Sequence, residues 1–378
     1  MENTSREFIC PKAQDLPYLS FDPHILLGDS LGLVLYAVVA ESYIAGKEGI
    51  ESTLYVKYQS NFPGERHEHS VAVFSRLVTS IKSNGYDYMF PVSAVPQAFI
   101  FSNGAHRMGT AIALGIQEVP YLYAMENNQP GLAAYPKIFS ELECRWLLAQ
   151  QQRLINELPR EQRLLCTMRQ FLSRRPESFR DAPFSSIAPV RDVILPYQGL
   201  EKIGLTGKRS AEKRFSIYRL ANYFSAEMEV LETGCNCGFL SWLVAQRVKH
   251  VDAFDVDANY ISLGSMLQQE YKTENLNYSV SRFENFATDK QYDAIISCAV
   301  YGWVPIPFAV FVEKLDRWLK PGGILLFESH ELIVHPEWKQ QRALLTDKYE
   351  LLYSEYIDDV DHAFYASEYR EFLVLKKK

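Results

Sequence analysis

Two acidic residues, Glu232 and Asp255, stand at the ends of short apolar runs in the second half of the chain. Glu232 is followed by Thr-Gly-Cys-Asn-Cys-Gly, and Asp255 lies near the end of the run 251–256. A strand that ends in an acid and turns through glycine into a helix brings a carboxylate and backbone N–H groups to one edge of a sheet. Small molecules bind at that edge, so the two acids predict a ligand site.

The glycine spacing separates the classes of ligand. A dinucleotide fingerprint requires Gly at positions 234, 236 and 239, whereas this chain has Gly234, Asn236 and Phe239. The side chains at 236 and 239 therefore keep a pyrophosphate from approaching the backbone closely, and NAD and FAD fit poorly. Cys235 and Cys237 have no matching His or Cys cluster, so we expect packing roles for them and no metal.

The elements that position these residues alternate between strands and helices from 224 to 378. Strands are expected at 229–232, 251–256, 277–283, 292–298 and 324–328, and helices at 239–248, 260–270 and 308–319. Two further runs, 349–356 and 370–375, are close enough to pair antiparallel. The pattern predicts an α/β domain with a seven-stranded, mostly parallel sheet covered by helices.

In this order the residues resemble the class I S-adenosylmethionine-dependent methyltransferases over about 205 to 378. The resemblance implies a Rossmann-like sheet whose last strand is antiparallel, and S-adenosyl-L-methionine as cofactor. It also implies that Glu232 faces the methionine ammonium and that Asp255 accepts both ribose hydroxyls, with Asp257 as the competing choice. Segment 281–285 would line the adenine, with Arg282 in place of the usual acid and Glu284 as substitute. The cofactor residues so expected are Arg209, Arg214, Tyr218, Glu232, Gly234, Asn236, Gly238, Phe239, Asp255, Val256, Phe283, Glu284 and Cys298.

In this family the acceptor side follows the fourth and fifth strands, here 298–304 and 328–335. His330 is the candidate general base because an imidazole titrates near neutral pH, and Glu331 is the reserve. A capping or solvated role for His330 remains open. Tyr301 and Trp303 are expected to stack against substrate or sulfonium, with core packing as the alternative.

A basic stretch, 204–220, precedes the first strand and is expected to be helical. On a helix Arg209, Lys213 and Arg214 would share one face with Tyr218. We expect Arg209 or Arg214 to grip the cofactor carboxylate or a substrate phosphate, since a guanidinium fork suits both. A solvated charged face is the alternative.

The front of the chain contains a second informative stretch, Asn-Gly-Ala-His-Arg, between an apolar strand and a helix. Gly104, His106 and Arg107 would place N–H groups and cationic side chains at a helix start. Over about 71 to 123 the sequence is similar to the ParB/sulfiredoxin-like fold, which implies a smaller α+β domain that holds phosphate or nucleotide. The expected substrate or phosphate residues are thus Gly104, His106, Arg107, Tyr301 and Trp303. An accessory domain that docks substrate or another subunit is the alternative.

Length and composition agree with a two-domain chain. It has 378 residues, 47% hydrophobic content and a net charge of -7. We expect domains at 1–139 and 191–378, joined by a helical linker at 140–190. The acidic balance argues against nucleic acid as a partner. The longest apolar run, 31–40, is too short for a membrane span, so the protein is expected in the cytoplasm, as a reducing compartment.

Together these features predict a methyltransferase for a hydroxyl or amine of a small molecule, a phosphorylated sugar or a glycan. The front domain would recognise phosphate or nucleotide. Two alternatives remain: a bifunctional kinase and methyltransferase, and a nucleotide-sensing regulator that binds nucleic acid. The acceptor and the oligomeric state are not predicted.

Overall fold

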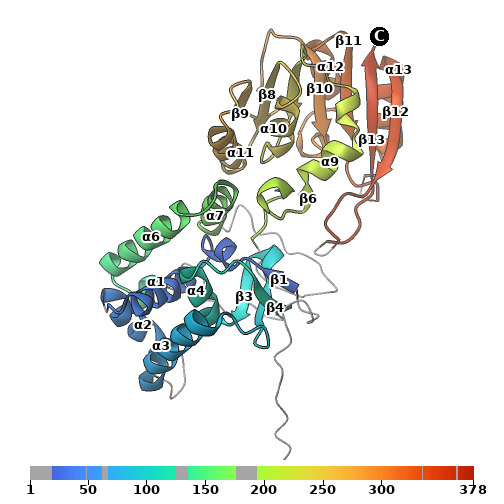
Figure 1. Ribbon diagram of the computed structural model, residues 1–378. Coiled ribbons are helices and arrows are strands. Elements are labelled where there is room, and N and C mark those ends of the chain that lie inside the picture. Colours follow the sequence, from blue (N-terminus) through green and yellow to red (C-terminus); the bar gives the residue numbers. More distant parts are fainter. Residues whose placement is uncertain are drawn as a thin grey trace, which may run out of the picture. The chain divides into compact units, whose positions relative to one another are not determined.

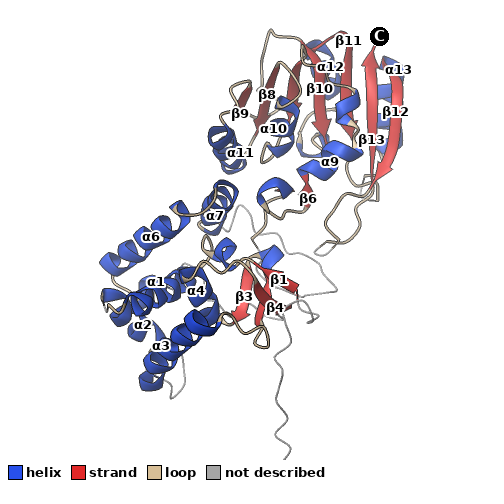
Figure 2. Cartoon of the chain, in the orientation of Figure 1, coloured by secondary structure: helices blue, strands red, loops and turns tan. Residues whose placement is uncertain are grey.

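The chain folds into two compact units, each considered by itself (Figures 1 and 2). A computed structural model describes residues 19–47, 49–61, 67–123, 135–175, 194–333, 335–362 and 365–378. Over these residues, 19–175 form the first unit and 194–378 the second. Residues 176–190 of the expected linker lie outside the described residues.

The first unit combines a small mixed sheet with helices. The sheet has the order β1-β4-β2-β3, in which β2 and β4 are parallel and the other pairs antiparallel. The strand, glycine turn, helix and strand expected around residue 104 are confirmed as β3, α4 and β4. The elements are β1 (Leu19–Phe21), η2 (Pro23–Leu26), α1 (Leu31–Ala45), α2 (Ile50–Gln59), α3 (His67–Asn84), β2 (Val92–Val95), η3 (Pro96–Ala98), β3 (Ile100–Asn103), α4 (Ala105–Ala113), β4 (Val119–Tyr123), α5 (Tyr135–Ile138), α6 (Glu141–Asn156) and α7 (Arg160–Ser173).

The apolar run 31–40 is the buried centre of this unit. It forms most of α1, whose residues from Leu31 to Ala40 are all buried, and α1 contacts α2, α3, α4 and α6. Ser30 caps the helix by accepting a hydrogen bond from the N–H of Leu33, and Gly46 ends it with φ of 65°. None of the described helices is both long and apolar enough to cross a bilayer.

Helices α6 and α7 pack within the first unit. The sequence instead predicted that they belong to a linker between the domains. Gln151 of α6 donates from Nε2 to the carbonyl of Leu27 over 2.7 Å. Arg169 of α7 is 2% exposed and pairs with Asp29 at 2.7 Å. Long-range polar contacts of this kind bind both helices to the residues before α1.

The second unit is built on a seven-stranded sheet of order β12-β13-β11-β10-β7-β8-β9. Strands β9, β8, β7, β10 and β11 are parallel, and β13 is antiparallel to both β11 and β12, so the expected mixed sheet is confirmed. The elements are β5 (Gln198–Gly199), η5 (Glu201–Ile203), β6 (Arg209–Ser210), α9 (Ala211–Ile217), η6 (Leu220–Asn222), β7 (Glu229–Thr233), α10 (Phe239–Ala245), β8 (His250–Asp255), α11 (Ala258–Tyr271), β9 (Leu276–Val280), β10 (Tyr292–Cys298), η7 (Tyr301–Trp303), α12 (Phe308–Trp318), β11 (Leu319–Glu328), α13 (Trp338–Lys348), β12 (Tyr349–Ile357) and β13 (Arg370–Lys377).

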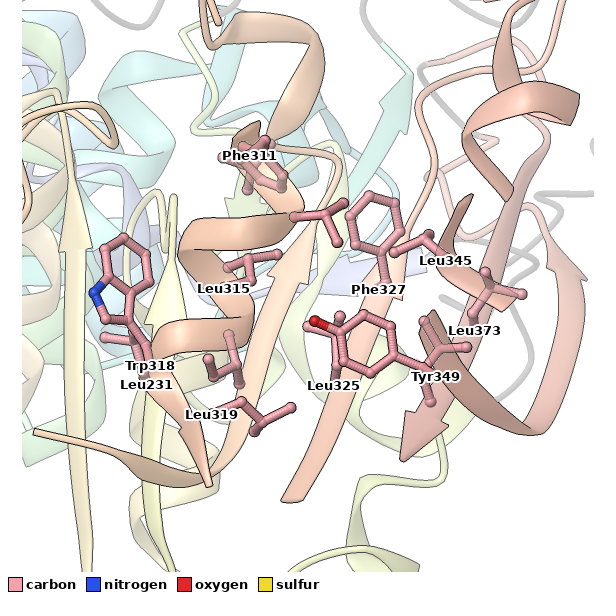
Figure 3. Packing of buried hydrophobic residues seen from close by; sticks show 14 of the residues in the cluster. Leu231, Phe311, Leu315, Trp318, Leu319, Leu325, Phe327, Leu345, Tyr349 and Leu373 are labelled. Atoms are coloured by element: carbon pink, nitrogen blue, oxygen red, sulfur yellow. The ribbon is translucent and has the colours of Figure 1, made fainter. Parts of the chain in front are cut away.

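The core of this unit lies between the sheet and its helices. Figure 3 shows Phe311 and Leu315 of α12 beside Leu325 and Phe327 of β11, and all four side chains are at most 2% exposed. Apolar residues three and four apart place one face of α12 on the sheet. Burial of these side chains fixes the strands whose ends carry the candidate site.

The stretch 204–220 is not the single helix that the sequence predicts. Its α-helix is confined to Ala211–Ile217, and Arg209 and Ser210 form β6, which pairs with β5. Gly207 packs directly against the backbone of Gly199, so a Cβ at either position would meet backbone atoms. This close approach keeps the chain extended until Ser210 caps α9 by accepting from the N–H of Lys213.

Candidate functional site

Glu232 lies at the carboxyl end of β7, beside the start of α10. Its carboxylate is 3% exposed and accepts a hydrogen bond from the hydroxyl of Ser241. Burial raises the pKa of Glu232 to about 7, although Ser241 and the charge of Arg214 oppose this. Near neutral pH this carboxyl group therefore changes charge readily.

Three residues of the loop after β7 have left-handed backbone conformations, which glycine adopts readily. Gly234, Asn236 and Gly238 have φ of 61°, 52° and 68°. A Cβ on Gly234 would lie 2.7 Å from Cγ2 of Val300, and one on Gly238 would overlap the ring of Tyr278. The two glycines are thus required both by the backbone and by side chains packed against the loop.

Asp255 ends the neighbouring strand β8 and is bonded to this loop. Its Oδ2 accepts from the N–H of Asn236 at 2.8 Å, and its Oδ1 accepts from the N–H of Asp257 at 3.0 Å. Burial raises its pKa. Asp257, the competing choice, caps α11 by accepting from the N–H of Asn259 at 2.7 Å. The geometry therefore favours Asp255 as the acid that belongs to the loop.

The residues expected around the adenine separate into two groups. Val256, which follows β8, is 58% exposed and offers apolar surface. Val280, which the sequence did not single out, ends β9 and is 54% exposed. Phe283 is instead a core residue, 4% exposed and stacked on Phe311 at a ring distance of 4.1 Å. Glu284 is partly exposed, and its carbonyl accepts from Lys314 Nζ at 2.6 Å.

Arg209 and Arg214 do not share a solvated helix face. Arg209 is fully buried and pairs with Asp359 and with Glu368, the latter at 2.7 Å. Arg214 is 3% exposed and pairs with Glu328 at 2.9 Å and with Asp359 at 3.4 Å. Both guanidinium groups are already occupied by carboxylates of the chain, so the expected grip on a ligand stays a prediction.

These arginines belong to a buried ion-pair cluster at the carboxyl end of the sheet. Glu328 ends β11, and Arg370 begins β13 within 3.5 Å of it. Burial alone would raise the pKa of Glu328, but the charges of Arg214, Arg370 and Arg209 hold it below its usual value. The cluster consists of Arg209, Arg214, Arg370, Glu328, Asp359 and Glu368.

Three other expected cofactor residues lie in or beside this cluster. The hydroxyl of Tyr218 accepts from Arg214 Nη2 at 2.7 Å, and its ring stacks on Phe372 at 4.1 Å. Cys298 ends β10 opposite Glu328, and burial raises its thiol pKa. Phe239 is fully buried and donates its N–H to Oε1 of Gln198 at 3.1 Å. All these contacts are with other residues of the chain, so the three residues support the site from within the fold.

On the acceptor side, the two loops after β10 and β11 meet. Nε2 of His330 accepts from the N–H of Gly302 at 2.8 Å, and burial lowers the pKa of His330 to about 4. Trp303 is 84% exposed, whereas Tyr301 packs on Phe308 at a ring distance of 4.7 Å. Glu331 is partly exposed. Of the two expected aromatic residues, Trp303 is exposed and Tyr301 is partly buried.

The expected phosphate residues of the first unit make internal contacts. Gly104 precedes α4 with φ of 95°. Nε2 of His106 lies 2.7 Å from the hydroxyl of Tyr55, and burial lowers its pKa to about 4, so the imidazole is neutral at physiological pH. Arg107 donates to the carbonyls of Phe90 and Pro91. His106 and Arg107 therefore do not form a pair of free cations.

The sequence did not reveal several residues that support the site. Gln198 donates to the carbonyl of Cys235 at 3.1 Å and accepts from Phe239, so it holds both ends of the glycine loop. Ser241 contacts Glu232. Gln198 lies in an irregular stretch without hydrophobic period, and Ser241 resembles any polar residue of a helix, so neither had a local signal.

The residues at the ends of β7 and β8 fit a sulfonium nucleoside. Oδ1 of Asn236 is buried and has no hydrogen-bond partner among the described residues. A buried orphan acceptor indicates a missing donor. Two acidic groups, Glu232 near the end of β7 and Asp255 at the end of β8, flank this loop, and Val256 adds exposed apolar surface after β8. Carboxylates suit an ammonium and a vicinal diol, and apolar surface suits a base.

Comparisons with known proteins agree with this geometry. Residues 207–365 match a family model described as "Methyltransferase domain". Malonyl-[acyl-carrier protein] O-methyltransferase 2 of Ilyobacter polytropus is 30% identical over 100 residues, which are 26% of this chain and 38% of that protein. Ubiquinone biosynthesis O-methyltransferase of Acinetobacter baumannii is 27% identical over 106 residues, 28% of this chain and 44% of that protein.

The similarity is confined to part of each protein. The chain spans about two fifths of the length of these curated relatives. Among solved structures, the N-methyltransferase NodS of Bradyrhizobium japonicum in complex with S-adenosyl-L-homocysteine is similar, with a TM-score of 0.37 and 16% identity. That similarity covers 44% of this chain and 87% of NodS.

Proposed function

We propose that this chain, which contains a methyltransferase domain in residues 207–365, transfers the methyl group of S-adenosyl-L-methionine to a hydroxyl group of a small molecule or glycan. The observation that supports the proposal best is the hydrogen bond from the N–H of Asn236 to Asp255. It joins the carboxylate of β8 to the glycine loop that follows Glu232. The relatives named as O-methyltransferases favour an oxygen acceptor over an amine.

In this proposal the residues around the glycine loop hold the cofactor. Glu232 accepts from the methionine ammonium, Asp255 accepts from the ribose hydroxyls, and Val256 packs on the base. The cofactor supplies an electrophilic methyl group on a positively charged sulfur. The acceptor oxygen forms a bond to that methyl carbon as the carbon–sulfur bond breaks, and the hydroxyl proton leaves to a base or to water. Positioning of the two reactants supplies much of the rate.

His330 and Glu331 are the proposed proton acceptors. In the described conformation Nε2 of His330 accepts from Gly302, so its role there is to join two loops. The imidazole is neutral at physiological pH and can take a proton after that bond opens. Glu331 is partly exposed and needs no such opening.

For the first unit we propose an accessory role in docking the acceptor or a phosphate. The internal contacts of His106 and Arg107 favour this role over catalysis. Within the part of the chain that the structure describes, no specific contact favours the kinase or the nucleic-acid regulator. Under the kinase alternative, the full chain would consume ATP in the presence of acceptor. Under the accessory role, phosphorylated product is absent while methylation proceeds.

The proposal is tested by following S-adenosyl-L-homocysteine formation by the full chain. The assay contains S-adenosyl-L-methionine and a panel of hydroxyl-bearing sugars, phenols and hydroxy acids. We expect formation of S-adenosyl-L-homocysteine to depend on one class of acceptor. If the full chain binds no S-adenosyl-L-methionine, and no panel member stimulates turnover, the proposal fails.

A further inference from the structure

A cavity of about 390 Å³ lies in the second unit, between the segment before α9 and the segment after β12. Arg209 and Val360 form an isolated antiparallel bridge, and the N–H of Asp361 donates to the carbonyl of Lys208 at 2.8 Å. These contacts hold the two segments together. The lining residues are Gly199, Glu201, Gly204, Leu205, Thr206, Gly207, Ser210, Lys213, Asp359, Val360, Asp361 and His362.

The cavity lies at the edge of the sheet that carries the candidate cofactor residues. Strands β11 and β12 are both antiparallel to β13, so they run parallel, and the chain leaves β12 after Ile357 at the carboxyl edge. Arg214 pairs with Asp359 in the cavity wall and with Glu328 at the end of β11. One buried guanidinium thus separates the cavity from the strand ends.

The charges of the lining argue against a phosphate ligand. Lys213 is the one lysine or arginine among the lining residues, against the carboxylates of Glu201 and Asp361. Asp359 is buried and already paired with Arg209 and Arg214, so its charge is compensated. The arginines behind Asp359 are already paired with carboxylates. A phosphate would therefore meet more like charge than opposite charge.

The hydrogen-bonding groups of the lining suit hydroxyl groups. Glu201 supplies acceptors, Lys213 supplies donors, and Thr206 adds a hydroxyl that does both. Each hydroxyl of a ligand both donates and accepts, so it can bond to all three kinds of group. The volume lies at the small end of the range of about 300–1,000 Å³ that is usual for ligand pockets.

We propose that this cavity binds the neutral, hydroxyl-rich part of the methyl acceptor, of the size of one monosaccharide. Glu201 accepts from sugar hydroxyls and Lys213 donates to one. As an acceptor site, it rests on the proposed function, and it narrows the acceptor from any small molecule or glycan to one with a neutral, hydroxyl-rich part. The charges and hydrogen-bonding groups of the lining are what select the ligand.

The test measures sugar binding to the full chain by saturation-transfer NMR titration, in the presence of S-adenosyl-L-homocysteine. The probes are glucose, galactose, mannose and N-acetylglucosamine, each with its 1-phosphate. We expect at least one neutral sugar to bind, and its 1-phosphate to bind more weakly. Glu201→Gln should weaken that binding at least fivefold, and Thr206→Trp, which fills the cavity, should abolish it.

Glu227→Gln is the matched control, because Glu227 is exposed and precedes β7 at the opposite edge of the sheet. It should leave sugar affinity unchanged. Binding of no neutral sugar, tighter binding of the 1-phosphates, or equal affinity in Glu201→Gln and Glu227→Gln would overturn the proposal. Glu201→Gln changes an exposed side chain, so the test holds even if Thr206→Trp does not fold.

Calorimetric titration of the same samples with S-adenosyl-L-homocysteine separates this inference from the proposed function. Cofactor binding without any sugar binding would overturn the cavity proposal alone. Sugar binding that Glu201→Gln weakens, without cofactor binding, would leave a sugar site and overturn the methyltransferase function.

Discussion

Gly302 donates its backbone N–H to Nε2 of His330 at 2.8 Å, and this bond joins the loop after β10 to the loop after β11. Because Nε2 accepts, the neutral imidazole carries its proton on Nδ1. A protonated imidazole could not accept from Gly302, so the bond requires the neutral form. Burial lowers the pKa of His330 from 6.5 to about 4 and thus favours that form.

This relationship predicts a pH dependence of stability. The unfolded chain protonates His330 near pH 6.5, whereas the folded chain does so only near pH 4. Its contribution is therefore complete above about pH 6.5 and decreases as the pH falls toward 4. His330→Gln removes this term, so the melting temperature of the wild type should fall more than that of the variant between about pH 7 and about pH 5. His106 is unchanged in both proteins. Equal decreases would show that His330 titrates normally.

The buried ion-pair cluster predicts a large cost for removing one charge. Glu328→Gln leaves Arg214 and Arg370 without their shared carboxylate. Loss of one partner of a buried pair typically costs about 3–5 kcal/mol. Glu331→Gln, on a partly exposed side chain, should change the free energy of unfolding by less than about 0.5 kcal/mol. Urea denaturation of both variants checks the difference, and similar midpoints would contradict a buried cluster.

The glycine loop predicts a difference between two glycines with positive φ. A Cβ on Gly238 would overlap Tyr278, whereas one on Gly322 would meet no atom within 4 Å. Gly322→Ala should cost about 1–2 kcal/mol from the backbone alone. Gly238→Ala should cost a further 1–3 kcal/mol, roughly, from overpacking. Thermal unfolding of both variants measures this. An equal loss of stability in both variants would mean that the side chain of Tyr278 moves aside at no energetic cost.

Substitutions of Asp255 and Asp257 should differ in their effect on cofactor affinity. Asp255→Asn removes one carboxylate oxygen from the loop and from the expected ribose contact. Loss of a charged hydrogen bond of about 1.5–3 kcal/mol corresponds to about 10- to 100-fold weaker binding of S-adenosyl-L-homocysteine. Asp257→Asn retains a good helix cap and should leave affinity unchanged. Calorimetry on both variants decides; a larger loss for Asp257→Asn would reverse the assignment.

The sequence predicted the sheet well because its elements carry local signals. Short apolar runs marked β7, β8 and β10 to within a residue. The same signals brought Glu232 and Asp255 to one edge, since parallel strands end together. Gly104 likewise marked the start of α4.

Long-range contacts account for what the sequence did not predict. The sequence predicted that Arg209 or Arg214 grips a ligand from a helix face, with a solvated face as the alternative. It did not reveal their carboxylate partners Glu328, Asp359 and Glu368, which lie more than a hundred residues later. The Gly199 and Gly207 contact that keeps 207–210 extended depends on close backbone approach, which composition does not encode. The sequence assigned α6 and α7 to a linker because it does not reveal the long-range contact of Arg169 with Asp29.

The central claim is that Glu232 and Asp255 hold a sulfonium nucleoside. The pKa of the free Glu232 carboxyl is raised to about 7, so the group becomes charged as the pH rises through that value. An ammonium group prefers the charged form. Calorimetric titration of the full chain with S-adenosyl-L-homocysteine, from about pH 6 to about pH 8, tests this directly. We predict one-site binding that tightens with pH in the wild type and is weak and pH-independent in Glu232→Gln; absence of binding at every pH would contradict the claim.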